Sequence, residues 1–406
     1  MPDTIRLLHF ADVHVGMENY GRLDPATGVS TRVADFLARL DEVVAYGLDH
    51  EADLAIFAGD AFKNREPEPT QQREFAKRIK RLAEAMPILL LVGNHDIPGM
   101  AQKASSVDIF GALGVPNVIV GDKAENRVVE TQRGPVFLAW MPYPMRNRLL
   151  SREEHTGKSI EELDAALREA LTTNLRASAE EAETQDMPRV FAGHFSIAEA
   201  KLGSERSVML GRDVAITRSV LADPVWDYVA MGHIHQRQDV NAGGVPPVVY
   251  SGSLERIDFG EEDETKGFCW VKLRRGTTTW QYVDVQARPF VTLRADVRGS
   301  EDPTGCVLEA IRGRDLAGAV VRMMVTLRSG QLGALRERDI EHVLKAASSV
   351  SVVKEVEHED RIRWGDIPIE TLTPAQLLGK YFQSKRVGEE HIRRLLEAAE
   401  GILKIE

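Results

Sequence analysis

The sequence predicts an α/β layered fold for its first part, then a smaller strand-and-helix domain, and finally a pair of helices. In the first part, short apolar runs alternate with longer amphipathic stretches, which is the pattern of strands joined by crossover helices. After Arg288-Pro289 this pattern gives way to a shorter mixture of strand-like and helix-like stretches. A chain of 406 residues that is 43% hydrophobic can bury at least one large core. We therefore predict domains at residues 1–285, 289–365 and 370–406.

Five apolar runs in the first domain are short and mostly flanked by turn residues. We predict that each forms a strand that is buried on both faces. The runs are Ile5–Phe10, Leu54–Ala58, Ile88–Val92, Val190–Ala192 and Tyr228–Met231.

Further elements complete the first domain. The stretch from Ser159 to Glu183 predicts a helix, because Ser159 and Glu162 have capping-box spacing and apolar residues recur on one face. From Val249 to Val283 the sequence becomes strand-like and rich in turns. There the segments YSGSLERIDFG and KGFCWVKLRRG predict antiparallel pairs.

The smaller domain and the tail follow. Strand-like runs at Phe290–Val297, Val320–Leu327 and Val350–Val356 alternate with helical stretches, which predicts a compact α+β domain. In the tail, Thr373-Pro374 begins a helix with Gln376 in the capping-box position, and a second apolar stripe follows. A helix pair of this length does not fold alone. We therefore expect it to dock on this chain or on a partner.

Composition points to a cytoplasmic protein without membrane contact. No run of about 18 or more apolar residues is present, and the N-terminus lacks the features of a signal peptide. Cys269 and Cys306 lie far apart, which suits a reducing compartment. The net charge of −11 argues against coating of nucleic acid by a global positive field. Bound divalent cations would reverse the local sign at an acidic site, so nucleic acid stays open as a ligand.

Each of the five predicted strands ends directly in residue types that bind metals. Side chains at the carboxyl ends of strands in an open α/β sheet converge on one crevice, so these residues can build one site. A glycine precedes the polar residue in four of the five clusters, which permits close approach of the backbone. The clusters are Asp12-Val13-His14, Gly59-Asp60, Gly93-Asn94-His95-Asp96, Gly193-His194 and Gly232-His233-Ile234-His235.

This set of residues predicts a centre with two metal ions. Carboxylates, an amide oxygen and imidazoles suit Mn, Fe or Zn better than Ca, and the absence of thiolates argues against a structural zinc. Seven candidate ligands exceed the needs of one ion and fit two ions roughly 3.5 to 4 Å apart, an arrangement that supports phosphoryl hydrolysis. Asp60 is the candidate bridging carboxylate. Each motif alone is weak evidence, whereas the ordered set is specific.

The five motifs resemble those of the calcineurin-like metallophosphoesterases, whose series runs D-x-H, G-D, G-N-H-D or G-N-H-E, G-H and G-H-x-H in this order. The resemblance implies a layered metallophosphoesterase sandwich. It also implies that His95 stabilises or protonates the leaving oxygen and is oriented by Asp96. One metal would be held by Asp12, His14, Asp60 and His235, and the other by Asp60, Asn94, His194 and His233.

Within that superfamily the chain resembles the SbcD-type nucleases, the bacterial counterparts of the meiotic-recombination nuclease, over essentially its whole length. The resemblance rests on LLHFADVHVGMENYG, WDYVAMGHIHQRQ, SGSLERIDFGE and KGFCWVKL. It implies a capping domain after the nuclease domain, and exonuclease and endonuclease action on DNA ends in double-strand-break repair. Manganese is the implied metal, with Mg, Fe or Zn as alternatives.

The same resemblance implies two protein partners. An SbcC-type ATPase would bind the C-terminal helices, and a second copy of the chain would pack on helices near the active site, with residues 71–85 and 101–113 as candidates. The pattern of those stretches is equally typical of simple crossover helices. Lys63 stands where many members have a histidine, which leaves the balance of exonuclease to endonuclease activity open.

Two other functions compete with a DNA nuclease. A phosphodiesterase acting on nucleotides or other small phosphodiesters would use the same metal centre, so the site alone does not separate the two. The additional domain and helix pair after residue 289 favour DNA. A non-catalytic scaffold for an ATPase is the second competitor, and the completeness of every motif, His95 included, argues against it.

Overall fold

The computed structural model describes residues 4–98, 103–145, 157–203, 214–357, 373–385 and 387–403. Two compact units make up the chain. The first comprises Met1–Leu293, Gly313–Met323 and Glu341–Ser351, and the second comprises Arg294–Arg312, Met324–Ile340 and Val352–Glu406. The first unit thus extends past the boundary that we predicted at residues 285–289 and includes two short segments from beyond it.

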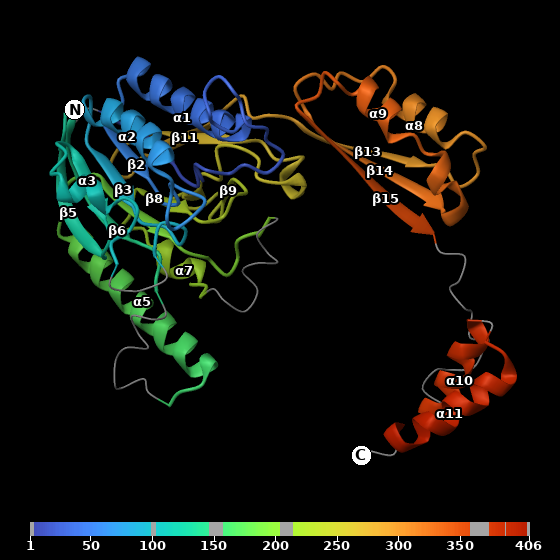
Figure 1. The fold of residues 1–406 in the computed structure, drawn as a ribbon. Helices are drawn as coiled ribbons and strands as arrows, with labels where there is room; N and C mark the ends of the chain where they lie inside the picture. The colour runs from blue at the N-terminus through green and yellow to red at the C-terminus, as the bar shows by residue number, and fades with distance from the viewer. Residues whose placement is uncertain are drawn as a thin grey trace. The chain divides into compact units, whose positions relative to one another are not determined.

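The first unit is built around two six-stranded sheets (Figure 1). In the first sheet the four strands β1 to β4 are parallel, and two antiparallel strands extend it at one edge. In the second sheet the four central strands are parallel and the pair at each edge is antiparallel. The first sheet has the order β12 (Thr279–Asp284), β11 (Gly267–Leu273), β1 (Ile5–Phe10), β2 (Leu54–Phe57), β3 (Ile88–Leu91) and β4 (Val118–Gly121). The second has the order β5 (Glu125–Thr131), β6 (Gly134–Met141), β7 (Arg189–His194), β8 (Tyr228–Gly232), β10 (Val248–Tyr250) and β9 (Gln238–Asp239).

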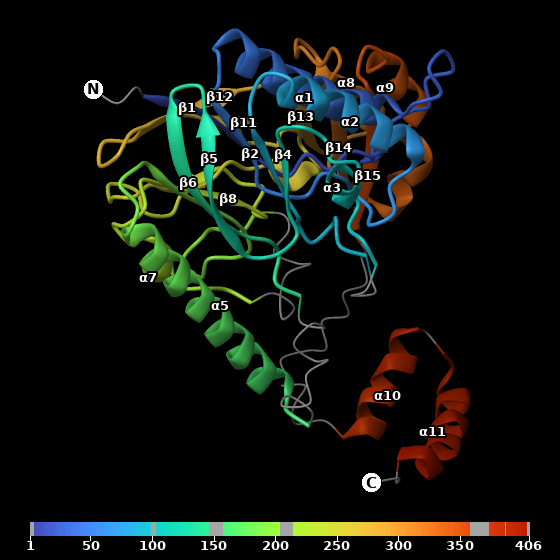
Figure 2. The same cartoon turned by 90° about the vertical axis from the view of Figure 1, so that its left-hand side faces the viewer.

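Apolar side chains fill three layers of this unit. Between the sheets, alternate residues of both pack together, among them Leu7 and Ile56 from one sheet and Leu138 and Ala230 from the other. The outer face of the first sheet is covered by α1 (Thr31–Asp49), α2 (Pro69–Ala83) and α3 (Asp108–Ala112). The outer face of the second sheet is covered by α5 (Ile160–Glu183) and α7 (Arg218–Leu221), as Figure 2 shows for α5. The predicted α/β sandwich is confirmed.

Most of the predicted elements form where the sequence placed them. All five apolar runs form strands, although β2 and β3 each end one residue earlier than predicted. The helix α5 begins with the predicted capping box, in which Ser159 accepts a hydrogen bond from the Glu162 amide. The expected antiparallel pair β11–β12 is present. The segment after Tyr250 was predicted wrongly as a strand, because it forms a loop and the 3-10 helix η2 (Phe259–Glu261).

The helix expected at residues 101–113 is shorter in the structure. Residues 101 and 102 lie outside the described part, and the rest is an α-helix only at Asp108–Ala112. Ser106 explains the late start. Its amide donates to the Asp96 carbonyl and its hydroxyl to the Asp96 carboxylate, which ties this segment to the loop after β3 and holds it out of the helix.

Three strands contribute residues to both units and form a sheet in the order β13 (Phe290–Asp296), β14 (Val320–Arg328) and β15 (Ser349–Glu357). The second unit also contains α8 (Pro303–Ile311), most of α9 (Glu337–Val343), and the pair α10 (Pro374–Ser384) and α11 (Glu389–Leu403), which pack on each other. The predicted capping box of α10 is confirmed, because Thr373 and Gln376 each accept a hydrogen bond from the other's amide.

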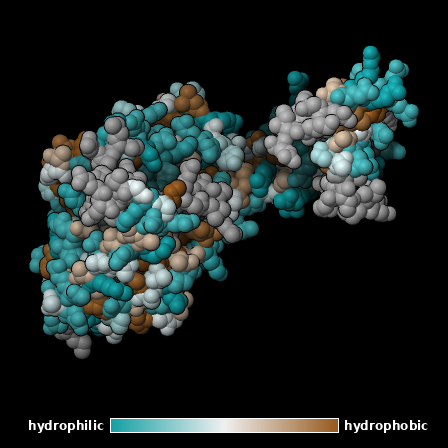
Figure 3. Space-filling view, turned by 90° about the horizontal axis from the view of Figure 1, so that it is seen from below, coloured by the Kyte–Doolittle hydropathy of each residue, from teal (hydrophilic) through white to brown (hydrophobic). Residues whose placement is uncertain are grey.

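The surface in Figure 3 is largely hydrophilic, with apolar residues in small scattered groups. Among the described residues, no helix combines the length and the apolar character that a membrane crossing requires.

Candidate metal centre

The loops that leave the central strands have unusual backbone conformations. Asp12, His14, Asp60 and His233 have φ angles of 51°, 46°, 61° and 97°, in the left-handed region that side chains other than glycine rarely adopt. Such residues cost of order 1 to 3 kcal/mol each and concentrate at functional sites. The loops after β1 and β2 hold each other in place, since the amides of Asp12 and His14 donate to the carbonyls of Gly59 and Asp60 at 2.9 and 3.1 Å.

Two glycines allow these loops to approach one another. A Cβ atom on Gly59 would lie 2.3 Å from His194 Nδ1, and one on Gly93 would lie 2.1 Å from Asp60 Oδ1. Neither contact is sterically possible, so any larger residue would displace a candidate ligand. The predicted role of glycine in close backbone approach is confirmed at both positions.

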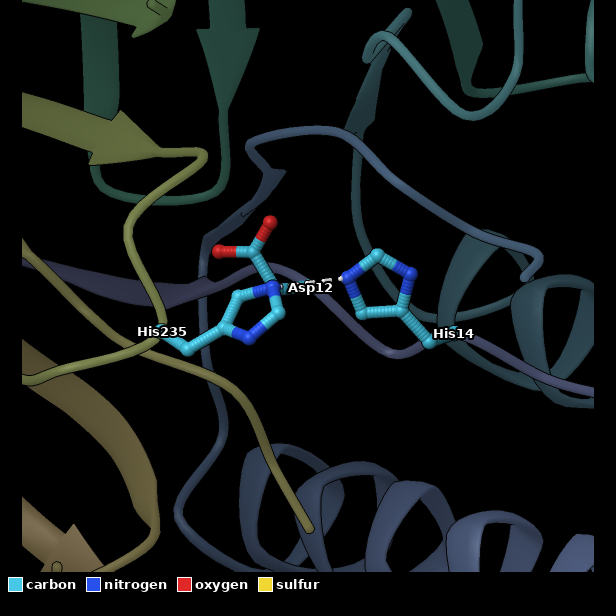
Figure 4. A group of neighbouring side chains, drawn as sticks. All are labelled: Asp12, His14 and His235. Carbon is cyan, nitrogen blue, oxygen red and sulfur yellow. Dashed lines mark hydrogen bonds between the residues drawn. The ribbon is translucent and has the colours of Figure 1, made fainter. Parts of the chain in front are cut away.

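Asp12, His14 and His235 form the first group of candidate ligands, and each offers a ligand atom within 4.8 Å of the others. The ring nitrogens of His14 and His235 point toward each other (Figure 4), with a distance of 3.0 Å between the two Nε2 atoms. Both oxygens of the Asp12 carboxylate accept from the His233 amide at 3.1 Å, which connects the loops after β1 and β8.

The second group shares Asp12 with the first and adds Asp60 and His194. Asp12, Asp60 and His194 offer ligand atoms within 4.8 Å of one another. Asn94 Oδ1 lies 3.1 Å from His194 Nε2 and 2.9 Å from His233 Nδ1, so it joins two histidines from different strands. These contacts bring together residues that follow β1, β2, β3, β7 and β8.

Asp60, a member of the second group, also lies near the first group. Its Oδ2 atom is 3.8 Å from His14 Nε2 and 3.5 Å from His194 Nε2. Burial opposes ionisation of this carboxyl, but His194, His95 and His14 together hold the pKa of Asp60 well below its usual range. A buried anion with a histidine of each group beside it has the position and the charge of a bridging ligand.

The hydrogen-bonding pattern of the histidines fits metal ions. His194 Nδ1 lies 2.6 Å from the Ala58 carbonyl and His235 Nδ1 lies 3.0 Å from Glu261 Oε1, so each ring donates from Nδ1. In a neutral ring that donates from Nδ1, the Nε2 atom carries a lone pair. This lone pair faces other hydrogen-bond acceptors, and for His194 the acceptor is the Asp60 carboxylate. Buried acceptors that face one another repel unless a cation lies between them. Imidazoles and carboxylates are the donors that Mn, Fe and Zn prefer.

A proton can take the place of that cation at His194. Burial lowers the pKa of this histidine, but the Asp60 carboxylate outweighs burial and raises the pKa to about 9. Metal binding at this position therefore competes with a proton, as is general for imidazole ligands.

His95 is held by two backbone contacts. Its amide donates to Asp60 Oδ1 at 2.8 Å, and its Nδ1 lies 2.8 Å from the Lys63 carbonyl, to which the ring donates. The centroid of the His95 ring is 4.9 Å from that of His14. The ring that we expected to assist the chemistry thus lies beside both Asp60 and the first group of ligands.

Asp96 has a different role from the one expected. We predicted that it orients His95, whereas the ring of His95 is oriented by the Lys63 carbonyl. The Asp96 carboxylate accepts from the amides of Asp60, Ala61 and Gly93 at 2.9 to 3.0 Å and from Ser106 Oγ at 3.2 Å. It is therefore a positioning residue that joins the loops after β2 and β3, and burial together with the Asp60 charge raises its pKa to about 7.

The residues that support the ligands were not predicted from the sequence. Glu261 contacts His235, and Lys266 forms an ion pair with Glu261 at 2.9 Å, with both side chains fully buried. The only signal for Glu261 in the sequence was its place in the SGSLERIDFGE segment. The carbonyls of Ala58 and Lys63 gave no signal, because a backbone acceptor is present at every residue.

Comparison of the sequence with known protein families identifies the class of protein that has this fold and this centre. The family described as calcineurin-like phosphoesterase matches residues 5–237, which is more than half of the chain. The chain therefore belongs to the calcineurin-like phosphoesterase family.

Within the family, the chain is similar to subunits of the SbcCD nuclease and to DNA double-strand break repair proteins. It is 26% identical over 268 residues to the SbcD component of the SbcCD nuclease from Escherichia coli K12, a match that covers 64% of this chain and 63% of that protein. The corresponding component from Rhodobacter capsulatus is 26% identical over 313 residues, covering 73% of each chain. The DNA double-strand break repair protein Mre11 of Haloferax volcanii is 24% identical over 319 residues, covering 78% of this chain and 60% of that protein.

Proposed function

We propose that this chain is a metal-dependent DNA nuclease that hydrolyses phosphodiester bonds with two divalent metal ions. The observation that carries the proposal is the pair of ligand groups joined by Asp60 at the ends of five central strands. In this assignment one ion is held by Asp12, His14, Asp60 and His235, and the other by Asp60, Asn94, His194 and His233. Two such ions would polarise a phosphodiester and lower the pKa of a water molecule.

The protein's own groups supply orientation and a proton. Asp60 fixes the backbone of His95, and the Lys63 carbonyl fixes the Nδ1–H of its ring. A protonated His95 then has its Nε2–H available to donate to the oxygen that leaves the phosphorus, as general acids do. Asp96 sets the shape of the loop that carries this histidine.

DNA is the proposed substrate, and the proposed action is exonuclease and endonuclease cleavage at DNA ends in double-strand-break repair. Support comes from the similarity to SbcD and Mre11 proteins and from the second unit, which a small substrate would not need. Manganese is the proposed metal. We place the protein in the cytoplasm, in keeping with Cys269 and Cys306, which are both free thiols.

The helices α10 and α11 are the proposed binding site for an SbcC-type ATPase. Both are amphipathic, and Tyr381 is 46% exposed. The name of the Escherichia coli relative describes it as one component of a larger nuclease, which supports a partner protein here.

The region of α2 and α3 is the proposed contact between two copies of this chain. A groove of about 350 Å³ is lined there by Pro69, Ala76 and Phe110, and at its rim Ile109 and Leu113 are 53% and 73% exposed. Large apolar side chains that are exposed beside an apolar groove are typical of protein interfaces.

The nuclease is tested with end-labelled linear duplex DNA and with bis-nitrophenyl phosphate, each in Mn, in Mg and with chelator. Wild type should cut both substrates with Mn, and His95→Ala should cut neither. Turnover of the small diester alone would instead favour a nucleotide phosphodiesterase or a nuclease that requires its ATPase. No turnover of either substrate would favour a scaffold.

A further inference from the structure

Glu261 is a buried carboxylate at which three hydrogen-bond donors converge. Its Oε1 atom lies 3.0 Å from His235 Nδ1. Its Oε2 atom accepts from the Ile257 amide at 2.9 Å and from Lys266 Nζ at 2.9 Å. The side chain is fully buried, so each of these bonds is made away from water. Only a carboxylate has enough acceptor sites on both oxygens for such a set of donors.

We propose that Glu261 is a positioning residue that holds His235 in the tautomer and the orientation with which its Nε2 atom binds a metal ion. The inference rests on the proposed metal centre. A neutral imidazole carries one proton, and donation of this proton from Nδ1 to Glu261 leaves the lone pair on Nε2. That atom faces His14 Nε2 inside the first ligand group. A carboxylate behind a metal-bound histidine fixes the ring and raises its basicity.

Lys266 holds the other end of this arrangement. Its ammonium group contacts Glu261 at 2.9 Å, Glu264 at 2.7 Å and Ser253 Oγ at 2.9 Å, and it donates to the His235 carbonyl at 3.4 Å. The lysine therefore balances the buried charge of Glu261 and also contacts the backbone of His235. Glu261 alone among these groups contacts the His235 ring by a side chain.

Glu264 provides a matched control. Like Glu261 it is an acidic residue that is paired with Lys266, but its side chain has no contact with His235 in the interactions that the structure describes. Glu264→Gln removes one of the two negative charges around Lys266 and leaves the bond between Glu261 and His235 in place. Glu261→Gln removes the other charge and leaves a single acceptor oxygen for three donors.

The test is titration of the metal-free full chain with Mn²⁺ by calorimetry, with the melting temperature recorded for each variant. Wild type should bind two ions. Glu261→Gln should bind one of them about 10- to 100-fold more weakly, which is the usual effect of losing such a supporting group, and should keep the affinity of the other. Glu264→Gln should bind both ions as wild type does.

Several outcomes would overturn the inference. It fails if Glu261→Gln binds both ions with unchanged affinity, or if Glu264→Gln loses as much affinity as Glu261→Gln, because the effect would then pass through Lys266. Wild type that binds no Mn²⁺ removes the centre on which the inference depends. Wild type that binds two ions but cleaves neither DNA nor bis-nitrophenyl phosphate would refute the nuclease while the inference on Glu261 stands.

A second variant covers the case in which Glu261→Gln does not fold. The double variant Glu261→Gln with Lys266→Met removes the unpaired lysine charge together with the carboxylate. It should fold and still bind one ion more weakly, since the His235 ring has lost its partner. Wild-type affinity for both ions in this double variant would contradict the inference.

Discussion

One histidine in each half of the candidate metal centre is held by a different kind of acceptor. In one half the Nδ1 atom of His194 donates to a backbone carbonyl, that of Ala58 directly after β2. In the other half the Nδ1 atom of His235 donates to a side chain, that of Glu261. Both arrangements leave Nε2 to face the ligand group, so the same tautomer is reached by two routes.

The difference has a consequence for mutation. The support of His194 belongs to the sheet itself and can be disturbed only by changing the backbone beside it. The support of His235 depends on one carboxylate and its lysine, and a single substitution can remove it. On the proposed role of Glu261, a substitution at this residue changes the properties of one ion without altering the framework that holds the other.

Asp60 belongs to both halves, and its loss should have the largest effect. Asp60→Ala should abolish binding of both ions, because the residue lies 3.8 Å from His14 Nε2 and 3.5 Å from His194 Nε2.

His95→Ala should keep both ions and lower cleavage of DNA by about 10²- to 10⁴-fold, the usual contribution of a general acid. Metal content by mass spectrometry and cleavage of labelled DNA measure the two effects. Equal metal content in the two variants would refute the assignment of these roles.

Gly59 tests the half that the backbone supports. Gly59→Ala places a Cβ 2.3 Å from His194 Nδ1 at a backbone φ of 100°. The substitution should therefore weaken the binding of one Mn²⁺ ion and leave that of the other unchanged. It should also lower the free energy of unfolding by at least about 1 to 3 kcal/mol. Gly28→Ala is the control, since Gly28 has a φ of 69° and no atom within 4 Å of the added Cβ. Urea unfolding and Mn²⁺ titration report the two effects. A control that loses as much metal affinity would show that backbone strain, and not the contact with His194, is responsible.

Much of the fold was predictable because its signals are local. Buried strands are continuous apolar runs, and the capping boxes of α5 and α10 are patterns within four residues. The segment after Tyr250 was predicted wrongly because its alternation resembles a strand. There Asp258 accepts from the Gly260 amide and starts a helical turn, and Glu261 is drawn inward by His235 and Lys266.

The candidate ligands were predictable for the same reason, since each lies at the end of a strand or within a few residues of it. Their supports were not. The carbonyls of Ala58 and Lys63 act through the backbone, and Glu261 lies 26 residues from His235 in the chain. The role of Asp96 was inferred from the family resemblance, whereas its carboxylate reaches back to the amides of another loop. Contacts that depend on the meeting of distant loops leave no local pattern.

His9 offers the mildest test, because it is a buried histidine that supports the fold instead of the metals. Its Nδ1 atom lies 3.0 Å from the Tyr228 hydroxyl, and burial lowers its pKa to about 3. The unfolded chain takes up this proton near pH 6.5, so the contribution of His9 to stability is present above that pH and is lost as the pH falls toward 3. At pH 4.5 the loss should be about 2 to 3 kcal/mol. His9→Gln keeps a partner for Tyr228 but cannot titrate, so its urea-unfolding free energy should fall less than that of wild type between pH 7 and pH 4.5. The ligand histidines are present in both proteins, so the difference in pH dependence between wild type and His9→Gln reports on His9 alone. An identical pH dependence of the two proteins would show that His9 is not neutral in the folded protein.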